Sequence, residues 1–316
     1  MQVHKPSPNL LLVGAPKCGT TSLMAWLREH PEIFHPWEKS HRNAAESGFL
    51  ISGIIDLPYH PSFRKGDLVL PDEINMNHYK GQKWILDKST QHLYSKRALS
   101  TISELMPDSK VIIMLRNPYE LFISYHSMIL NKTLYYDTPL ETLISQLDII
   151  DWRADEKDPK TWPFVSYPKF SKHIISWIEE LGENRVRVIP LESLKDPKGV
   201  LEQLSTWLDI DINSIPKKFP NQNTGGALSN SKLSKFLREP PNWAFNLSRF
   251  ILPSRNLRKL LLDPIRRTGW KHVKAEKKPI SPEVERYIKQ QLSESRNRRM
   301  YEPICRVNYR GHCVRW

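Results

Sequence analysis

The sequence reads Asn9-Leu10-Leu11-Leu12-Val13-Gly14-Ala15-Pro16-Lys17-Cys18-Gly19-Thr20-Thr21-Ser22 near its start. The apolar run before Gly14 is typical of a short buried strand. Apolar residues at positions 23, 24, 26 and 27, followed by Pro31, predict a helix directly after the loop. A turn between a strand and a helix offers backbone N–H groups and the positive helix end to an anion. The stretch therefore predicts a phosphate-binding loop in an α/β protein.

This loop differs from the phosphate loop of kinases and NTPases. Gly14 and Gly19 have the spacing of the G-x-x-x-x-G-K-[ST] loop, but Thr20 stands in place of its lysine. The only lysine of the segment is Lys17, inside the loop, where it would approach the bridging oxygen of a diphosphate-like group. Hydroxyl groups at positions 20–22 add further donors. Taken alone, such a loop is weak evidence, and its alternative interpretation is a tight turn between a strand and a helix.

A second anion motif follows the apolar strand predicted over 111–115. Arg116 stands at the carboxyl end of that strand, where many NTPases have a magnesium-binding aspartate. Ser124 follows inside a helix that Pro118 opens and that runs to about residue 130. Ligands of open α/β sheets bind at this edge, and arginine with serine suits a phosphate. Two such motifs without a magnesium ligand favour a nucleotide with separate 5′ and 3′ anions.

Strands and helices alternate along the first two thirds of the chain. Further strands are predicted at 84–86 and 185–189, and further helices from Ser89 or Thr90 to about 105, from 138, from 167 to Gly182 and from 196 to about 208. This order predicts an α/β, P-loop-like, three-layer fold with a central parallel sheet flanked by helices. We expect a single domain over 1–316, with a nucleotide-binding core at 9–220 and a basic C-terminal extension of helices and loops at 221–316, including a helix from Ser281.

The formal net charge is +13, which favours anionic partners such as nucleotides, glycans, nucleic acid or an acidic membrane surface. A solubilising basic surface explains the charge equally well. Nine lysines and arginines lie between 254 and 278, either as the wall of a groove for an anionic substrate or as a solvated helical face. The sequence has no zinc-finger, RNP or recognition-helix pattern, so a nucleic-acid partner is not expected.

The three cysteines, Cys18, Cys305 and Cys313, are too few for a disulfide framework or a zinc site. We expect free thiols in a reducing compartment, with a Cys305–Cys313 pair as the alternative. No metal site is predicted. The sequence shows neither a signal peptide nor an apolar run long enough to cross a bilayer, so a cytoplasmic location without a transmembrane segment is expected.

The two anion motifs together resemble the paired signatures of sulfotransferases that use PAPS (3′-phosphoadenosine-5′-phosphosulfate). The first resembles the family's P-K-x-G-T-T-x-L loop, here Pro16-Lys17-Cys18-Gly19-Thr20-Thr21-Ser22-Leu23. The second resembles its 3′-phosphate motif, here Arg116-Asn117-Pro118 with Ser124. Asp87-Lys88-Ser89-Thr90 resembles an E-K-[ST]-P segment of the glycan-modifying branch. The pattern is most similar to heparan-sulfate-type and bacterial members. Leu121 and His126 depart from an arginine and a tyrosine that the family often has.

The resemblance implies sulfuryl transfer from PAPS to a hydroxyl or amine, with 3′,5′-ADP as the product and no metal. The implied acceptor is a carbohydrate or glycoconjugate, which the positive charge would suit if it is anionic. The donor would be bound by Lys17, Cys18, Gly19, Thr20, Thr21, Ser22, Arg116 and Ser124. Lys17 and Lys88 would act on the transferred group. A P-loop small-molecule kinase or NTPase, and a non-catalytic polyanion-binding protein, stay as alternatives.

The general base is left open by the sequence. The glycan-modifying branch has a glutamate in K-E-P-H-F-F after the first helix, and Lys39 stands at that position here. Glu38 and His41 are the nearest substitutes, ahead of His126 and Asp87. Each of the four has the alternative interpretation of an exposed charge or a hydrogen-bonded polar residue.

Overall fold

The computed structural model describes residues 7–36, 50, 76–132, 170–219, 227–228, 270–271 and 280–293. The chain divides into two compact units. The first comprises residues 1–126, 140–222 and 281–316, and the second comprises residues 127–139 and 223–280. The division into a core at 9–220 and an extension at 221–316 stays a prediction.

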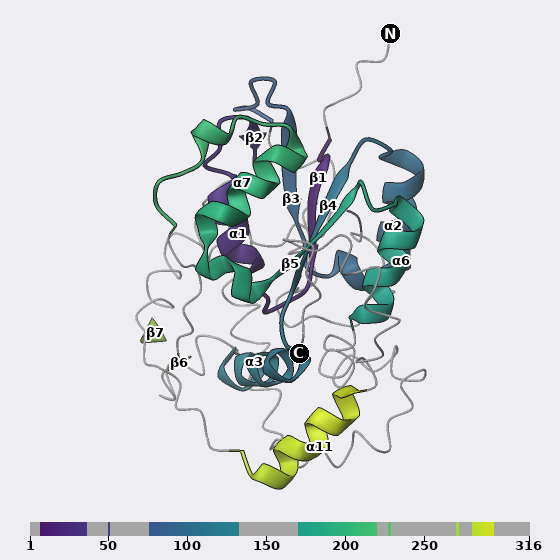
Figure 1. Cartoon of the computed structure of the whole chain (residues 1–316), viewed down its shortest axis with the longest axis vertical. Helices are drawn as coiled ribbons and strands as arrows, with labels where there is room; N and C mark the ends of the chain where they lie inside the picture. Colours follow the sequence, from purple (N-terminus) through teal and green to yellow (C-terminus); the bar gives the residue numbers. More distant parts are fainter. Residues whose placement is uncertain are drawn as a thin grey trace, which may run out of the picture. The chain divides into compact units, whose positions relative to one another are not determined.

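The first unit is built on a five-stranded parallel sheet with the order β2-β3-β1-β4-β5 (Figure 1). Its strands are β1 (Leu10–Gly14), β2 (Ile33–Phe34), β3 (Trp84–Lys88), β4 (Lys110–Leu115) and β5 (Val186–Pro190). Every residue of β1 is buried, as its apolar run requires in the middle of a sheet covered on both faces. The strands predicted from the sequence are therefore confirmed, each to within two residues at its ends.

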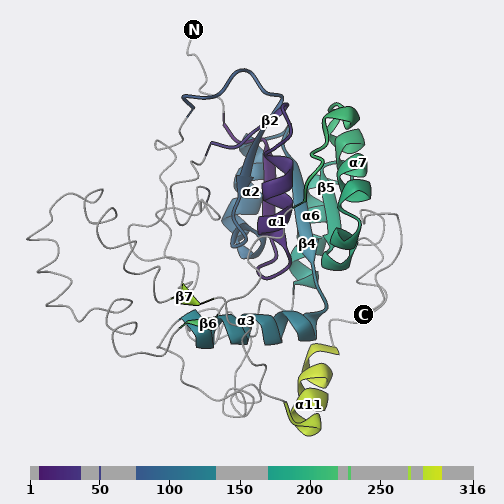
Figure 2. The same cartoon turned by 90° about the vertical axis from the view of Figure 1, so that its left-hand side faces the viewer.

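Helices cover both faces of this sheet. Figure 1 shows α1 (Thr20–Leu27) and α7 (Pro197–Leu208) on one face, and α2 (Lys96–Leu105) and α6 (Ser171–Leu181) on the other. Figure 2 shows the same layers from the side of α1. The three-layer α/β prediction is confirmed. The remaining helices of the first unit include α3 (Pro118–Lys132), which continues into the second, and α11 (Pro282–Ser293). In the second unit, β6 (Ala227–Leu228) pairs with β7 (Trp270–Lys271) in antiparallel fashion.

Side-chain caps mark the starts of α7 and α2, and the cap of α2 differs from the sequence prediction. Asp196 caps α7, where its Oδ1 accepts from Gly199 N at 3.1 Å and Pro197 occupies the first turn. The cap predicted at Ser89 or Thr90 is wrong. Ser89 N instead donates to Leu12 O at 3.1 Å, so the chain at Ser89 still lies alongside β1. The 3-10 helix η2 (His92–Tyr94) comes next. Ser95 is the true cap of α2, since its Oγ accepts from Ala98 N at 3.1 Å.

Two further predicted helices are only partly described. The helix predicted from 167 begins at Ser171 and ends before Gly182, whose φ of 81° suits a helix terminus. The helix predicted from 138 lies outside the described residues. So do Cys305, Cys313 and most of the basic stretch 254–278. Within the described ranges, no helix has the length and apolar character to cross a membrane, and the cytoplasmic location stays a prediction.

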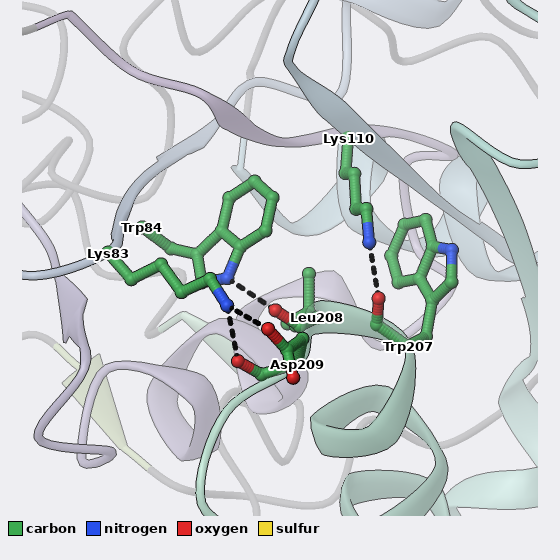
Figure 3. A network of polar contacts seen from close by, with 6 residues as sticks. All are labelled: Lys83, Trp84, Lys110, Trp207, Leu208 and Asp209. Atoms are coloured by element: carbon green, nitrogen blue, oxygen red, sulfur yellow. Dashed lines mark hydrogen bonds and ion pairs between the residues drawn. The ribbon is translucent and has the colours of Figure 1, made fainter.

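Two lysines and a tryptophan at the amino ends of β3 and β4 donate hydrogen bonds to the carboxyl end of α7 (Figure 3). Trp84 Nε1 donates to Leu208 O at 3.0 Å, and Lys83 Nζ donates to the Asp209 carbonyl at 2.5 Å and to its carboxylate at 2.6 Å. Lys110 Nζ donates to the carbonyl of Trp207 and lies 4.8 Å from the centre of its ring. Positive groups at this end complement the helix dipole and satisfy its last carbonyls. The contacts fix α7 against the sheet.

The stability of the protein should depend on pH through His173, whose ring lies 5.1 Å from that of Tyr94. Burial lowers the pKa of His173 to about 4, and Lys172 and Lys96 act in the same direction. The unfolded chain therefore binds more protons than the folded one between about pH 6.5 and 4, and stability falls as the pH drops through that window.

We expect the unfolding free energy to fall by about 2 kcal/mol between pH 7 and 5 because of His173, measured by urea unfolding. The His173→Gln variant should lose less stability over the same interval. Equal losses in the two proteins would contradict the assignment.

Candidate anion site at the carboxyl edge of the sheet

The loop between β1 and α1 turns sharply through two residues with positive φ. Lys17 has φ 63° and Gly19 has φ 84°. Gly19 is the N-cap of α1, and its carbonyl accepts from Ser22 N at 3.0 Å and from Leu23 N at 3.2 Å. It has no side chain to bond the first-turn N–H groups, and no described side chain caps this helix. The positive end of α1 is thus open to an anion.

Glycine is required in this loop for space as well as for conformation. A Cβ on Gly14 would lie 2.7 Å from Leu93 Cβ. One on Gly19 would lie 2.6 Å from Leu191 Cδ1 and 2.9 Å from Leu194 Cδ1. Both of these leucines belong to η5 (Leu191–Lys195), directly after β5. The loop is therefore packed between η2 on one side and η5 on the other, and the sequence alone gave no sign of these contacts.

Lys88 reaches the loop from the neighbouring strand. It is the last residue of β3, pairs in register with Leu12 of β1 and is 2% exposed. Its Nζ donates to Thr21 Oγ1 at 3.2 Å, in the first turn of α1. A buried ammonium is costly unless it is hydrogen bonded. The structure thus brings Lys88 together with the loop, and its role on the transferred group stays a prediction.

The second motif lies beside the loop because β4 is the other neighbour of β1. Ala15 N donates to Met114 O at 2.8 Å and ties the loop to the end of β4. Asn117 caps α3, where its Oδ1 accepts from Tyr119 N at 3.0 Å and from Glu120 N at 3.3 Å. Arg116 Nε donates to Glu120 Oε2 at 3.0 Å. Ser124 lies further along α3 and is half-buried.

The electrostatics of Cys18 reflect how near the two motifs are. Its thiol is fully buried and donates to Pro16 O at 3.4 Å. Burial raises the pKa of Cys18, whereas the charges of Arg116 and Lys17 lower it and that of Glu192 raises it. Cations from both motifs thus act on one atom of the loop. The thiol itself stays neutral, so it is a packing group of the loop and not a nucleophile.

A helix from the C-terminal part of the chain packs beside the second motif. Ile288 of α11 is 1% exposed, and Lys289 Nζ lies 5.1 Å from the centre of the Tyr119 ring. Lys289 also pairs with Glu285 at 2.6 Å. Burial raises the pKa of Tyr119, and Glu285 adds to this shift. Residues far apart in sequence therefore support the first turn of α3.

The structure describes two of the four residues that the sequence suggested as the general base, Asp87 and His126. Glu38 and His41 lie outside the described residues. Asp87 is fully buried, with its Oδ2 3.7 Å from Nδ1 of His92, which is itself fully buried. His126 is 9% exposed. Asp87 is thus a buried polar group beside a core histidine, and the identity of the general base stays a prediction.

Comparison with known proteins gives one family. A model described as the sulfotransferase domain matches residues 7–239. A bifunctional heparan sulfate N-deacetylase/N-sulfotransferase 1 of Caenorhabditis briggsae is 24% identical over 221 residues, covering 65% of this chain and 23% of that protein. A heparan sulfate glucosamine 3-O-sulfotransferase 3B1 of Mus musculus is 23% identical over 223 residues, covering 70% of this chain and 51% of that protein. The chain therefore spans about a quarter to half the length of these relatives.

A crystal structure of a sulfotransferase from Alicyclobacillus acidocaldarius has a similar fold. It matches with a TM-score of 0.54 and 20% identity, over 82% of this chain and 97% of that one. At this level of identity the likeness concerns the fold alone. It agrees with the P-loop-like arrangement of the sheet and its helices.

The packing around Gly19 predicts a specific cost for a methyl group there. We expect Gly19→Ala to lower the unfolding free energy more than Gly81→Ala, by about 1 kcal/mol, because its Cβ would displace the terminal methyl groups of two half-buried leucines. Gly81 is the matched control, since it has a similar φ of 83° and nothing within 4 Å of an added Cβ. Its own substitution should cost only about 1–2 kcal/mol of backbone strain. Urea unfolding of both variants measures the difference, and equal losses would contradict the packing argument.

Proposed function

We propose that this chain, which belongs to the sulfotransferase family, transfers a sulfuryl group from PAPS to a hydroxyl or amine of a carbohydrate or glycoconjugate. The observation that carries the proposal is the pairing of β1 with both β3 and β4. It gathers the open end of α1, Lys88 and Arg116 at one edge of the sheet. PAPS has two anionic ends that such an arrangement suits.

The donor would be bound from two sides. The loop residues 17–22 and the N–H groups of α1 would take the 5′-phosphosulfate, by the helix-terminus chemistry that binds phosphates. Arg116 and Ser124 would take the 3′-phosphate, since guanidinium and hydroxyl groups are strong phosphate donors. ATP has no 3′-phosphate, so this second subsite would disfavour it. Cys18 would contribute its backbone only, because its thiol is buried and neutral.

Side chains of this protein would catalyse the chemical step. In-line attack at sulfur would build negative charge on the bridging oxygen that leaves. Lys17, with the hydroxyls of Thr20 and Thr21, would stabilise that charge, and preorganised donors of this kind contribute about 3–4 kcal/mol each. Lys88 would hold a sulfuryl oxygen from the other side of the loop. Glu38 or His41 would take the acceptor proton, a contribution of roughly 100- to 10,000-fold.

The proposed acceptor class rests on two observations. The two relatives described above have names that give heparan sulfate as their substrate. The net charge of +13 would attract a polyanionic sugar chain of that type. We therefore propose an anionic saccharide as acceptor. Lysines and guanidinium groups supply the neutralisation in this proposal, and no metal is invoked.

A ligand comparison tests the proposal against a kinase or NTPase. Thermal unfolding should show a clear rise in midpoint with 3′,5′-ADP and little change with Mg-ATP, because only the former presents a 3′-phosphate to Arg116. Labelled PAPS should then give a sulfated product with an acidic saccharide in a panel that also contains phenols and lipids. Stabilisation by Mg-ATP alone, or retention of polyanions without sulfuryl transfer, would refute the proposal.

The role of Lys17 predicts a kinetic signature. Lys17→Ala should reduce turnover by roughly 100- to 1,000-fold while the affinity for 3′,5′-ADP changes little, because the lysine would act on charge that develops in the transition state. Steady-state kinetics and calorimetry of the product nucleotide measure the two effects. Lys172→Ala on α6 is the control, since it removes an exposed lysine elsewhere on the same unit. Near-normal turnover of the Lys17 variant would contradict the assigned role.

A further inference from the structure

We propose that Glu120 is a positioning residue that aims Arg116 and thereby sets the preference for a 3′-phosphate. The inference rests on the proposed function, because it concerns the same donor. Its basis is the contact in which Arg116 Nε donates to Glu120 Oε2 at 3.0 Å. Nothing in the sequence singled out this glutamate.

The backbone places the two residues for this contact. Asn117 caps α3 and Pro118 fixes the first helical φ, so Glu120 stands at the third position of the helix. A glutamate at this position commonly reaches back toward the start of its own helix. Here its carboxylate accepts from the arginine directly before the cap. Residues 116–120 thus place the carboxylate of Glu120 within hydrogen-bond distance of the guanidinium.

The contact leaves the guanidinium able to bind a phosphate. A guanidinium has five N–H donors, and one of them is on Nε. With Nε held, the four donors on the two terminal nitrogens are oriented as a fork that matches phosphate oxygens. A free arginine side chain would lose much more rotamer entropy on binding. Holding Nε in advance therefore favours binding of the 3′-phosphate.

The pair between Arg116 and Glu120 is a surface contact that adds little to stability. The two side chains are 23% and 52% exposed, and such i,i+4 surface pairs contribute little to folding. Glu120 and Ser124 are also one turn apart and share a face of α3. An anion held by Arg116 and Ser124 would then lie near the carboxylate. Solvent and the arginine charge screen that repulsion, so orientation outweighs it.

Calorimetry with two nucleotides tests the inference. Glu120→Ala should weaken binding of 3′,5′-ADP about 3- to 10-fold and leave binding of 5′-AMP unchanged. Glu120→Gln should keep binding within about twofold, because its amide oxygen still accepts from Nε. The control is Glu202→Ala on α7, which breaks another i,i+4 pair, with Lys198 at 3.6 Å. It should change neither affinity.

Each contrary outcome has a separate meaning. If Glu120→Ala binds 3′,5′-ADP as tightly as the parent or more tightly, or loses 5′-AMP by the same factor, the positioning role is wrong. Should the alanine variant not fold, Glu120→Asp keeps the charge but shortens the reach, and it must show the same selective loss. A parent protein without any preference for 3′,5′-ADP over 5′-AMP would instead overturn the proposed function.

Discussion

The position of β1 in the middle of the parallel sheet is the constraint on which the rest of this unit depends. It pairs with β3 on one side and β4 on the other, so three chain segments leave the sheet at the same edge. The loop after β1 supplies an open helix end, β3 supplies Lys88 and β4 supplies Arg116. Arg116 would not join the other two groups if β4 were paired elsewhere, because it is 99 positions from Lys17 in the sequence.

Packing contacts at the carboxyl end of the sheet and polar contacts at its amino end keep the surrounding elements in place. At the carboxyl end, η2 leaves no room for a side chain at Gly14, and two leucines of η5 lie close to Gly19. At the amino end, Lys83, Trp84 and Lys110 fasten the last residues of α7, the helix that follows η5. A scaffold packed in this way would let the short loop act as a preorganised anion site, because little reorganisation would be left to binding.

Much of the architecture could be predicted from local patterns. The apolar run at 111–115 has to be buried on both faces, and Asp196-Pro197 is a strong helix start, so both appear where expected. The cap of α2 was misplaced because Ser89 and Thr90 have the chemistry of a cap. Pairing of Ser89 with Leu12 takes precedence, and a sequence pattern does not contain that contact. Lys17, Arg116 and Lys88 could be proposed because each follows a predicted strand.

The sequence by itself determined the alternation of strands and helices, the positions of the two candidate anion motifs and the family resemblance that the match over 7–239 confirms. These depend on residues close together in the chain, whose spacing is fixed by backbone geometry. Only the tertiary structure decided which strands are neighbours, that Lys88 bonds Thr21, and that Asp87 is buried beside His92. Such contacts follow from long-range packing, where burial and partner availability, and not local propensity, select the final arrangement.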